Sequence, residues 1–281
     1  LKSLDTNTPF PILLFLMGQR NRNIASETIE KIAADLDSYL VRRFVCGLTG
    51  KNYNRFFVGL LRTLRQATDA GRDPHSAIRE ALLEPTGSAG VWPDDRAFFR
   101  AWLNRGVYYQ TRPDRSVMLL RAIEDQLRRD NAKSEAHTPP DNLTVEHLMP
   151  QAADPKVYPI PDAATLPLRE DESLEQRRQR LLHTIGNVTL LTGSLNASNS
   201  NDPFTEKRAE IADHSDLRLN ARFRDPQIKR WTEPDIMQRG LELFEPALRI
   251  WPHPNGQTGD WAYVTELREI VMHAKPSTST S

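Results

Sequence analysis

The residues of this chain that are best suited to chemistry lie in three short segments of its second half. Glu146 and His147 end an apolar run, Asn187 opens a second such run, and Asn196 follows that run. A neutral imidazole can take a proton from water near pH 7, and carboxylate and amide oxygens are ligands that suit Mg²⁺. Hydrolysis of a phosphodiester needs both a base and a cation. The three segments are therefore suited to a metal-dependent phosphodiesterase site.

Two short strands and a helix must bring these residues together. Residues 143–150 contain a strand-like run that ends in the acid, the histidine and a proline, and residues 185–191 form another run of β type. Phe204 and Lys207 follow on a predicted helix. The order strand–His, strand–Asn, helix–Asn is the layout of a ββα-metal finger, the core of HNH nucleases. Between the strands, residues 152–180 are rich in proline and charge, and so long a loop is typical of a functional element or an insertion.

The first half of the chain is predicted to be helical. Apolar residues recur there at the 3.6-residue spacing of amphipathic helices, and Ser and Gly stand where helices begin and end. The predicted helices cover residues 26–46, 53–70, 74–83 and 94–104, and a fifth begins at Ser116. We therefore expect a mainly α fold, in which a helical bundle is followed by the ββα-metal finger embedded in further helices.

The charge balance excludes some classes of function. The chain of 281 residues holds 37 Lys and Arg against 37 Asp and Glu, so it is no polycation that binds nucleic acid by bulk charge. The charge is unevenly spread, because residues 1–139 carry a net +5 and residues 140–281 a net −5. Within residues 40–72, seven basic residues stand against one acid, Asp69. This stretch predicts either a contact with a polyanion or a solvated helix face.

Cysteine content and hydropathy exclude other classes. The single cysteine, Cys46, rules out an internal disulfide and a Cys-rich zinc finger, and it fits a reducing cytoplasm. The most apolar stretch, residues 10–17, is far shorter than the roughly 20 residues needed to cross a bilayer, so no membrane partner is expected. Because the chain starts at Leu1 and not at Met, we expect it to be part of a longer protein.

Several motifs of the chain resemble one family. They comprise the three site segments, the start of the helix that follows them and a closing helical region, namely residues 146–151, 183–191 and 196–201, Phe204, Lys207, residues 231–236, Arg239, Leu243 and residues 251–252. These segments resemble the C-terminal HNH domain of GmrSD-type modification-dependent restriction endonucleases. Further matches at residues 39–43 and 119–124 resemble the helical segment that this family places before the nuclease.

The resemblance implies a role for each site residue. His147 would be the general base that activates water, while Glu146 and Asn196 would bind Mg²⁺ or Mn²⁺. Asn187 would pin the finger through bonds to the backbone, and Lys207 would contact phosphate. The implied activity is that of a DNA endonuclease, with nicking of the duplex as the expected outcome, in a bacterial anti-phage restriction protein.

The resemblance also implies an organisation and partners. A helical domain would cover residues 1–138, an HNH nuclease domain with its closing helix residues 139–252, and a C-terminal extension residues 253–281. The last residues of that extension, 276–281, are predicted from their composition to be a disordered tail. The expected partners are double-stranded DNA and an N-terminal NTPase and sensor domain of the same full-length protein, whose motif is not found in this sequence. The candidate DNA contacts besides Lys207 are Arg42, Arg43, Arg62 and Arg65.

Other interpretations stay open. The finger can be a degenerate scaffold in a non-catalytic DNA-binding or regulatory module, in which the four arginines bind phosphates. The chain can also be a structural partner of the NTPase half that neither binds nor cuts DNA. His183 is a candidate second ligand, but a packing or solvent-facing role is the commoner use of such a histidine.

Overall fold

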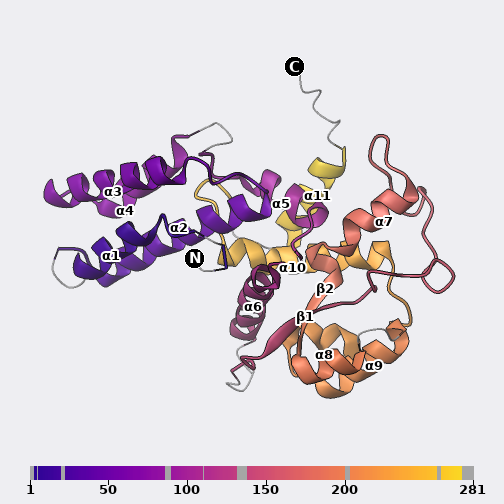
Figure 1. Ribbon diagram of the computed structural model, residues 1–281. Coiled ribbons are helices and arrows are strands. Elements are labelled where there is room, and N and C mark those ends of the chain that lie inside the picture. Colours follow the sequence, from indigo (N-terminus) through magenta and orange to yellow (C-terminus); the bar gives the residue numbers. More distant parts are fainter. Residues whose placement is uncertain are drawn as a thin grey trace. The chain divides into compact units, whose positions relative to one another are not determined.

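The protein is mainly helical. The computed structural model describes residues 3–4, 6–19, 23–85, 90–109, 111–131, 138–199, 203–257 and 261–273, and within these ranges its only sheet has two antiparallel strands (Figure 1). The predicted fold class is confirmed. The predicted disordered tail, residues 276–281, lies outside the described ranges. None of the helices described is long and apolar enough to cross a membrane.

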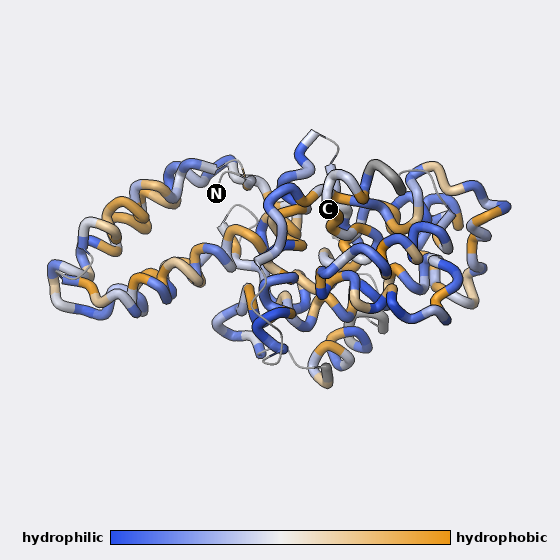
Figure 2. The backbone as a smooth tube through the Cα atoms, turned by 90° about the horizontal axis from the view of Figure 1, so that it is seen from below, coloured by the Kyte–Doolittle hydropathy of each residue, from blue (hydrophilic) through white to orange (hydrophobic). Residues whose placement is uncertain are grey.

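The elements follow the chain in a simple order. The helices are α1 Phe10–Gln19, α2 Ser26–Val45, α3 Tyr53–Asp69, α4 Pro74–Leu83, α5 Asp95–Asn104, α6 Pro113–Asp130, α7 Leu174–Leu182, α8 Gly193–Asn199, α9 Phe204–His214, α10 Glu233–Ile250 and α11 Trp261–His273. The short 3₁₀ helices are η1 Ile185–Asn187 and η2 Arg218–Arg224, and the strands are β1 Leu143–His147 and β2 Val188–Thr192. Apolar and polar residues interleave along most helices (Figure 2), as the predicted amphipathic periodicity requires.

Helix α1 was not predicted, and the predicted start of α6 was wrong. No helix was predicted at α1, because its residues are apolar on nearly every side and so lack the 3.6-residue pattern. The fifth predicted helix begins at Pro113 and not at Ser116, because a proline suits the first turn of a helix, where its missing N–H costs nothing. Ser116 is buried instead, and its Oγ donates to the Val107 carbonyl at 2.9 Å.

The structure divides into two compact units. Unit 1 comprises residues 1–101 and 251–281, and unit 2 comprises residues 102–250. These are units of packing. The predicted division at residues 138 and 252 is a division by function and stays a prediction.

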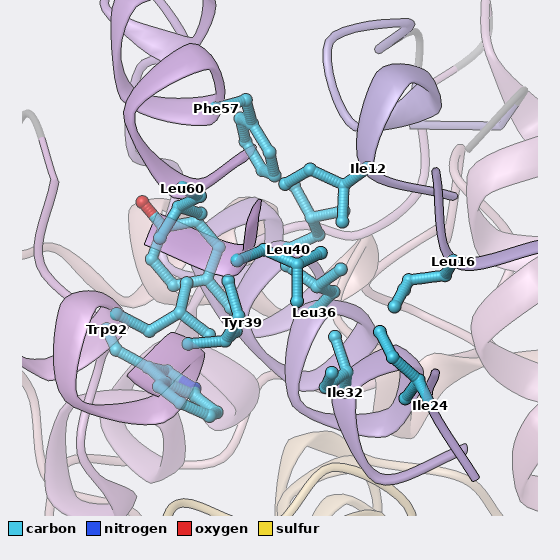
Figure 3. Close-up of a cluster of buried hydrophobic side chains, with 13 residues drawn as sticks. Ile12, Leu16, Ile24, Ile32, Leu36, Tyr39, Leu40, Phe57, Leu60 and Trp92 are labelled. Carbon is cyan, nitrogen blue, oxygen red and sulfur yellow. The ribbon is translucent and has the colours of Figure 1, made fainter. Parts of the chain in front are cut away.

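The core of unit 1 is an apolar cluster between α1, α2, α3 and α4 (Figure 3). Tyr39 of α2 lies within it, stacked on Phe56 at 5.5 Å between ring centroids and edge-on to Trp92 at 6.1 Å. Ile32 and Leu36 extend the same face of α2, as the predicted periodicity places them. Burial of this face against α3 and α4 is what stabilises the helices of unit 1.

Unit 2 is built around the two-stranded antiparallel sheet of β1 and β2. Leu143 pairs with Thr192 and His147 with Val188, so the two strands are in register over their whole length. α6 packs against both strands, α8 follows β2 directly and contacts both strands, and α10 packs against η1. The order of β1, β2 and α8, and the packing of α8 on the two strands, are consistent with a ββα finger.

Candidate functional site

The β1–β2 sheet holds the candidate acid and base at one end. Glu146 and His147 are the last two residues of β1, and only 7% of Glu146 and 6% of His147 is exposed. Just beyond the strand, the Leu148 N–H donates to the Asn187 carbonyl at 2.9 Å. The turn that leaves β1 is therefore joined to the segment that enters β2.

Asn187 ties this turn to its neighbours. Its Oδ1 accepts from the Met149 N–H at 2.8 Å and from Trp231 Nε1 at 3.2 Å. Its Nδ2 donates to the carbonyls of Met149 at 3.0 Å and Leu182 at 2.9 Å. A side-chain amide has two donors and an oxygen with two lone pairs, so these bonds use its full capacity. Asn187 acts on the site by holding the backbone beside His147 and has no capacity left for a ligand.

Helix α10 binds the backbone on both sides of Asn187. Arg239 is buried, and its Nη1 donates to the carbonyls of Gly186 at 3.1 Å and Val188 at 2.7 Å, on either side of Asn187. Gly186 has no room for a side chain, because a Cβ there would lie 2.0 Å from the Ile236 carbonyl oxygen. The close approach of α10 to η1 thus depends on this glycine.

His147 contacts a second histidine. Its Nε2 lies 3.2 Å from Nδ1 of His183, the residue that follows α7. Its Nδ1 lies 3.5 Å from Nε2 of Gln151, at the long end of the hydrogen-bonding range. The ring of Tyr108 packs edge-on against the His147 ring, with 4.6 Å between centroids. The imidazole is therefore held from three sides.

The sequence did not indicate Tyr108 as a neighbour of His147, and it did not indicate which residue His183 contacts. Tyr108 lies in the connection before α6 and has no motif around it that could have marked it. His183 was weighed as a ligand or a packing residue, whereas the structure places it against the candidate base. Its position, three residues before Gly186 in the segment that leads into β2, was the available signal.

Glu146 is paired with Lys207 of α9. The Lys207 ammonium donates to Glu146 Oε1 and, at 3.0 Å, to the His147 carbonyl. Only 1% of Lys207 is exposed. In this structure the lysine therefore neutralises the acid from inside and does not extend into solvent, where the predicted phosphate contact would place it.

Burial sets the protonation of this cluster. Burial lowers the pKa of His147 to about 4, and the nearby His183 and Lys207 contribute to this lowering. The pKa of Glu146 is raised by burial, although its bond and charge interaction with Lys207 oppose the rise. At neutral pH His147 is therefore an uncharged imidazole, which is the form that can accept a proton.

Asn196 of α8 lies against the same strand. Its Nδ2 donates to Thr144 Oγ1 at 2.9 Å and to the Val145 carbonyl at 3.1 Å. Among the described residues, its Oδ1 takes part in no hydrogen bond, whereas the Glu146 carboxylate accepts from Lys207 and also interacts with the backbone N–H of His147. Asn196 is not among the residues that line the pocket around Glu146, and the described ranges contain no group of three or more His, Cys, Asp and Glu that could hold a metal. An amide oxygen and a carboxylate oxygen are nevertheless donors that suit Mg²⁺, which keeps several of its own waters.

The acid, the base and the lysine line a pocket. Its volume is about 530 Å³, and Tyr108, Gln151 and Asp154 line it together with Glu146, His147 and Lys207. This volume lies within the range of roughly 300–1,000 Å³ that is common for ligand sites. The base is thus accessible from a concave surface in spite of its burial.

The segment between the strands forms one wall of this pocket. Val157, which is 60% exposed, and Tyr158 both line it. Arg178 of α7 holds this wall, because its Nη1 donates to the Tyr158 carbonyl at 2.7 Å while its Nε donates to Glu233 of α10 at 2.7 Å. The Tyr158 hydroxyl accepts from the Phe204 N–H at 3.0 Å. The loop predicted at residues 152–180 is therefore an anchored part of the site.

The four arginines predicted to contact DNA differ in their surroundings. Arg42 and Arg43 of α2 are completely buried. Arg42 donates to Asp95 and to the Trp251 carbonyl, both at 2.7 Å, and Arg43 donates to the Val91 carbonyl at 2.7 Å. They hold unit 1 together and do not present their charge to solvent.

Arg62 and Arg65 lie on the exposed face of α3. Lys51 and Arg55 are exposed on the same helix or just before it. Within the described part of the chain, none of these four cations forms an ion pair with an acid, although the Arg65 guanidinium lies 5.5 Å from the centre of the Phe15 ring. We call this set, Lys51, Arg55, Arg62 and Arg65, the α3 basic face.

Comparison with known families gives one result. A family model that describes the C-terminal domain of GmrSD restriction endonucleases matches residues 92–245, which include every residue of the pocket cluster. A comparison with curated proteins finds no match for the chain.

Proposed function

The chain belongs to the family of GmrSD restriction endonucleases, and from this membership we propose that it is a metal-dependent DNA endonuclease domain of the HNH type in a bacterial anti-phage restriction protein. The observation that carries the proposal is the placement of a neutral His147 beside Glu146 at the end of β1, open to a pocket. The order of Asn187 before β2 and Asn196 in α8 supports the proposal.

His147 is the general base in the proposed reaction. It takes a proton from a water molecule while the water oxygen bonds to phosphorus and the bond from phosphorus to the 3′ oxygen breaks. The 3′ oxygen takes up a proton from solvent, so the products are a 5′-phosphate and a 3′-hydroxyl. A base of this kind contributes about 10²- to 10⁴-fold to a rate.

Glu146 and Asn196 are the proposed ligands of Mg²⁺ or Mn²⁺, through a carboxylate oxygen and the amide Oδ1. A bound ion would supply positive charge to the phosphate and to the leaving 3′ oxygen. Lys207 compensates the charge of Glu146 in the folded chain, and a phosphate contact of its ammonium would require release from Glu146 and the His147 carbonyl.

Double-stranded DNA is the proposed substrate, and the α3 basic face is its proposed second contact. Four cations without acidic partners in the described residues suit a phosphate backbone, which dominates the affinity of proteins for DNA. We also propose an N-terminal NTPase and sensor domain as a partner within the full-length protein, and a cytoplasmic location. Nicking is the expected outcome because one site cuts one strand at a time. We further propose that this organisation resembles that of SspE, a phosphorothioate-sensing defence nuclease.

Cleavage of supercoiled plasmid tests the proposal. With Mg²⁺ or Mn²⁺ the chain should convert supercoiled DNA to the open circular form, and His147→Ala should lower the rate by about 100-fold or more. His214→Ala is the matched control, since His214 is an exposed histidine of unit 2 outside the pocket. Equal rates for His147→Ala and the unaltered chain would contradict the assigned mechanism.

A non-catalytic DNA-binding module remains the second candidate. The observation in its favour is the buried Glu146–Lys207 pair, in which the lysine occupies the candidate acid. Salt-sensitive binding to DNA without cleavage under any divalent metal would support this candidate and contradict the nuclease.

A further inference from the structure

We propose that His183 is a positioning residue that selects the tautomer of His147. In this arrangement His147 carries its proton on Nε2 and donates it to Nδ1 of His183, so that Nδ1 of His147 is the nitrogen left to act as the base. The benefit to catalysis rests on the proposed function. The tautomer itself can be measured without any cleavage.

The partners of the two nitrogens of His147 define the tautomer. In a neutral imidazole one nitrogen donates and the other accepts. Nδ1 faces the amide Nε2 of Gln151 at 3.5 Å, and because an amide nitrogen can only donate, this contact favours Nδ1 as the accepting nitrogen. Nε2, at 3.2 Å from Nδ1 of His183, is therefore the donor. Gln151 also lines the pocket, so the accepting nitrogen is the one on the substrate side.

His183 is held firmly enough to perform this role. Its carbonyl accepts from the N–H groups of Val107 at 2.8 Å and Tyr108 at 3.3 Å. The Tyr108 ring lies nearly parallel to the His183 ring, with 6.0 Å between centroids and 19° between planes. Because its Nδ1 accepts from His147, the proton of His183 lies on Nε2. Both main chain and ring are thus fixed on the side of the base that faces away from Gln151.

The histidine pair joins two distant segments, since His147 ends β1 and His183 follows α7. The pairing makes the second histidine a partner of the base and leaves its Nδ1 unavailable to a metal. A second group that orients a catalytic imidazole and fixes its tautomer is a general device, because a base that carries its proton on the wrong nitrogen cannot accept one there.

Nitrogen chemical shifts of the imidazoles test the tautomer directly. In the full chain labelled with ¹⁵N-histidine, long-range proton–nitrogen spectra at pH 7.5 should show His147 protonated on Nε2, with the signal assigned by its absence in His147→Gln. His183→Leu should convert this to a mixture of tautomers or to the Nδ1–H form. An unchanged Nε2–H signature in His183→Leu would overturn the proposal.

Two amide variants separate positioning from packing. The oxygen of an asparagine reaches about the position of Nδ1 of histidine, whereas that of a glutamine reaches about the position of Nε2. His183→Asn should keep the Nε2–H tautomer of His147, and His183→Gln should lose it. His183→Gln and His183→Leu should lower kcat for plasmid cleavage by at least about tenfold with little change in KM, and His183→Asn should restore most of that loss.

The outcomes distinguish this inference from the proposed function. The expected tautomer pattern in a chain that cuts no DNA supports the positioning role and contradicts the nuclease. Active enzyme with equal kcat and the same tautomer in the Asn, Gln and Leu variants overturns the positioning role and leaves the nuclease in place. His214→Leu, an exposed histidine replaced in the same way, should change neither measurement.

Discussion

Glu146 and Lys207 form a buried pair in which each charge depends on the other. The carboxylate is largely desolvated, and burial raises its pKa in spite of the ammonium beside it. Taking charges out of water is expensive, and a pair of this kind offsets the cost only while both partners are present. The pair therefore matters to folding as well as to the proposed metal site.

Lys207→Met should destabilise the chain in a manner that depends on pH. Without the ammonium the pKa of Glu146 rises further, so above its raised pKa the folded state carries an unpaired buried charge, whereas below the unfolded pKa near 4.3 both states hold a proton. We expect a loss of roughly 3 kcal/mol in unfolding free energy at pH 7.5 and a smaller loss at pH 5, measured by urea titration.

The double variant Glu146→Gln, Lys207→Met provides the control for this prediction. It removes both charges, so its loss of stability should be smaller and should vary less with pH than that of Lys207→Met. If Lys207→Met lost the same free energy at both pH values, the lysine would be acting by packing alone.

Helix α3 shows how a charge run and a helix face combine. Its apolar positions Phe57, Leu60 and Leu64 are buried in unit 1, and this burial turns Arg55 and Arg62 outward. The basic stretch in the sequence could be divided between exposed and buried arginines only when this packing was known. The candidate DNA contacts in the stretch at residues 40–72 are consequently reduced to the four cations of the α3 basic face.

Arg55→Gln with Arg62→Gln should weaken binding to duplex DNA and reduce its salt dependence. Each phosphate contact contributes about 0.9 to the slope of log K against log salt, so the slope should fall by about 2. Fluorescence anisotropy over a salt series measures this. Lys31→Gln with Lys229→Gln, two lysines elsewhere on the chain, should leave the slope unchanged. An unaltered slope in the arginine variant would show that Arg55 and Arg62 do not contact DNA phosphates.

The chain as a whole leaves unit 1 after residue 101 and returns to it at residue 251. Arg42 fastens the returning segment, since it donates to the Trp251 carbonyl and pairs with Asp95, both buried. The hydroxyl of Tyr263 in α11 also reaches Asp95, at 3.0 Å. The stability of unit 1 thus depends on residues from both ends of the chain.

Arg42→Met should destabilise unit 1 without altering the salt dependence of DNA binding. Removing the guanidinium leaves Asp95 buried without its charged partner, which costs about 3–5 kcal/mol. Thermal unfolding monitored by tryptophan fluorescence measures the loss. Arg42→Met with Asp95→Asn should recover part of it. A reduced salt slope in folded Arg42→Met would instead show that this arginine contacts DNA.

Much of this organisation could be predicted from local pattern. The amphipathic spacing marked α2 to α5, the β-type runs marked both strands, and the order of Glu146, His147, Asn187 and Asn196 along them suggested the finger. These signals are local, because the period of a helix or strand and the turn residues at its ends lie within a few positions of one another. The family and the mainly helical fold followed from them.

The partners of the polar side chains were decided only by the tertiary structure. Lys207 meets Glu146 from 61 positions away, His183 meets His147 from 36, and Arg42 meets Trp251 from 209. Whether a charged residue faces solvent, fills the interior or orients a base depends on which distant segment packs over it. Such contacts form because a buried polar group requires a hydrogen-bond or charge partner. The local periodicity of the sequence does not indicate which distant residue that partner is.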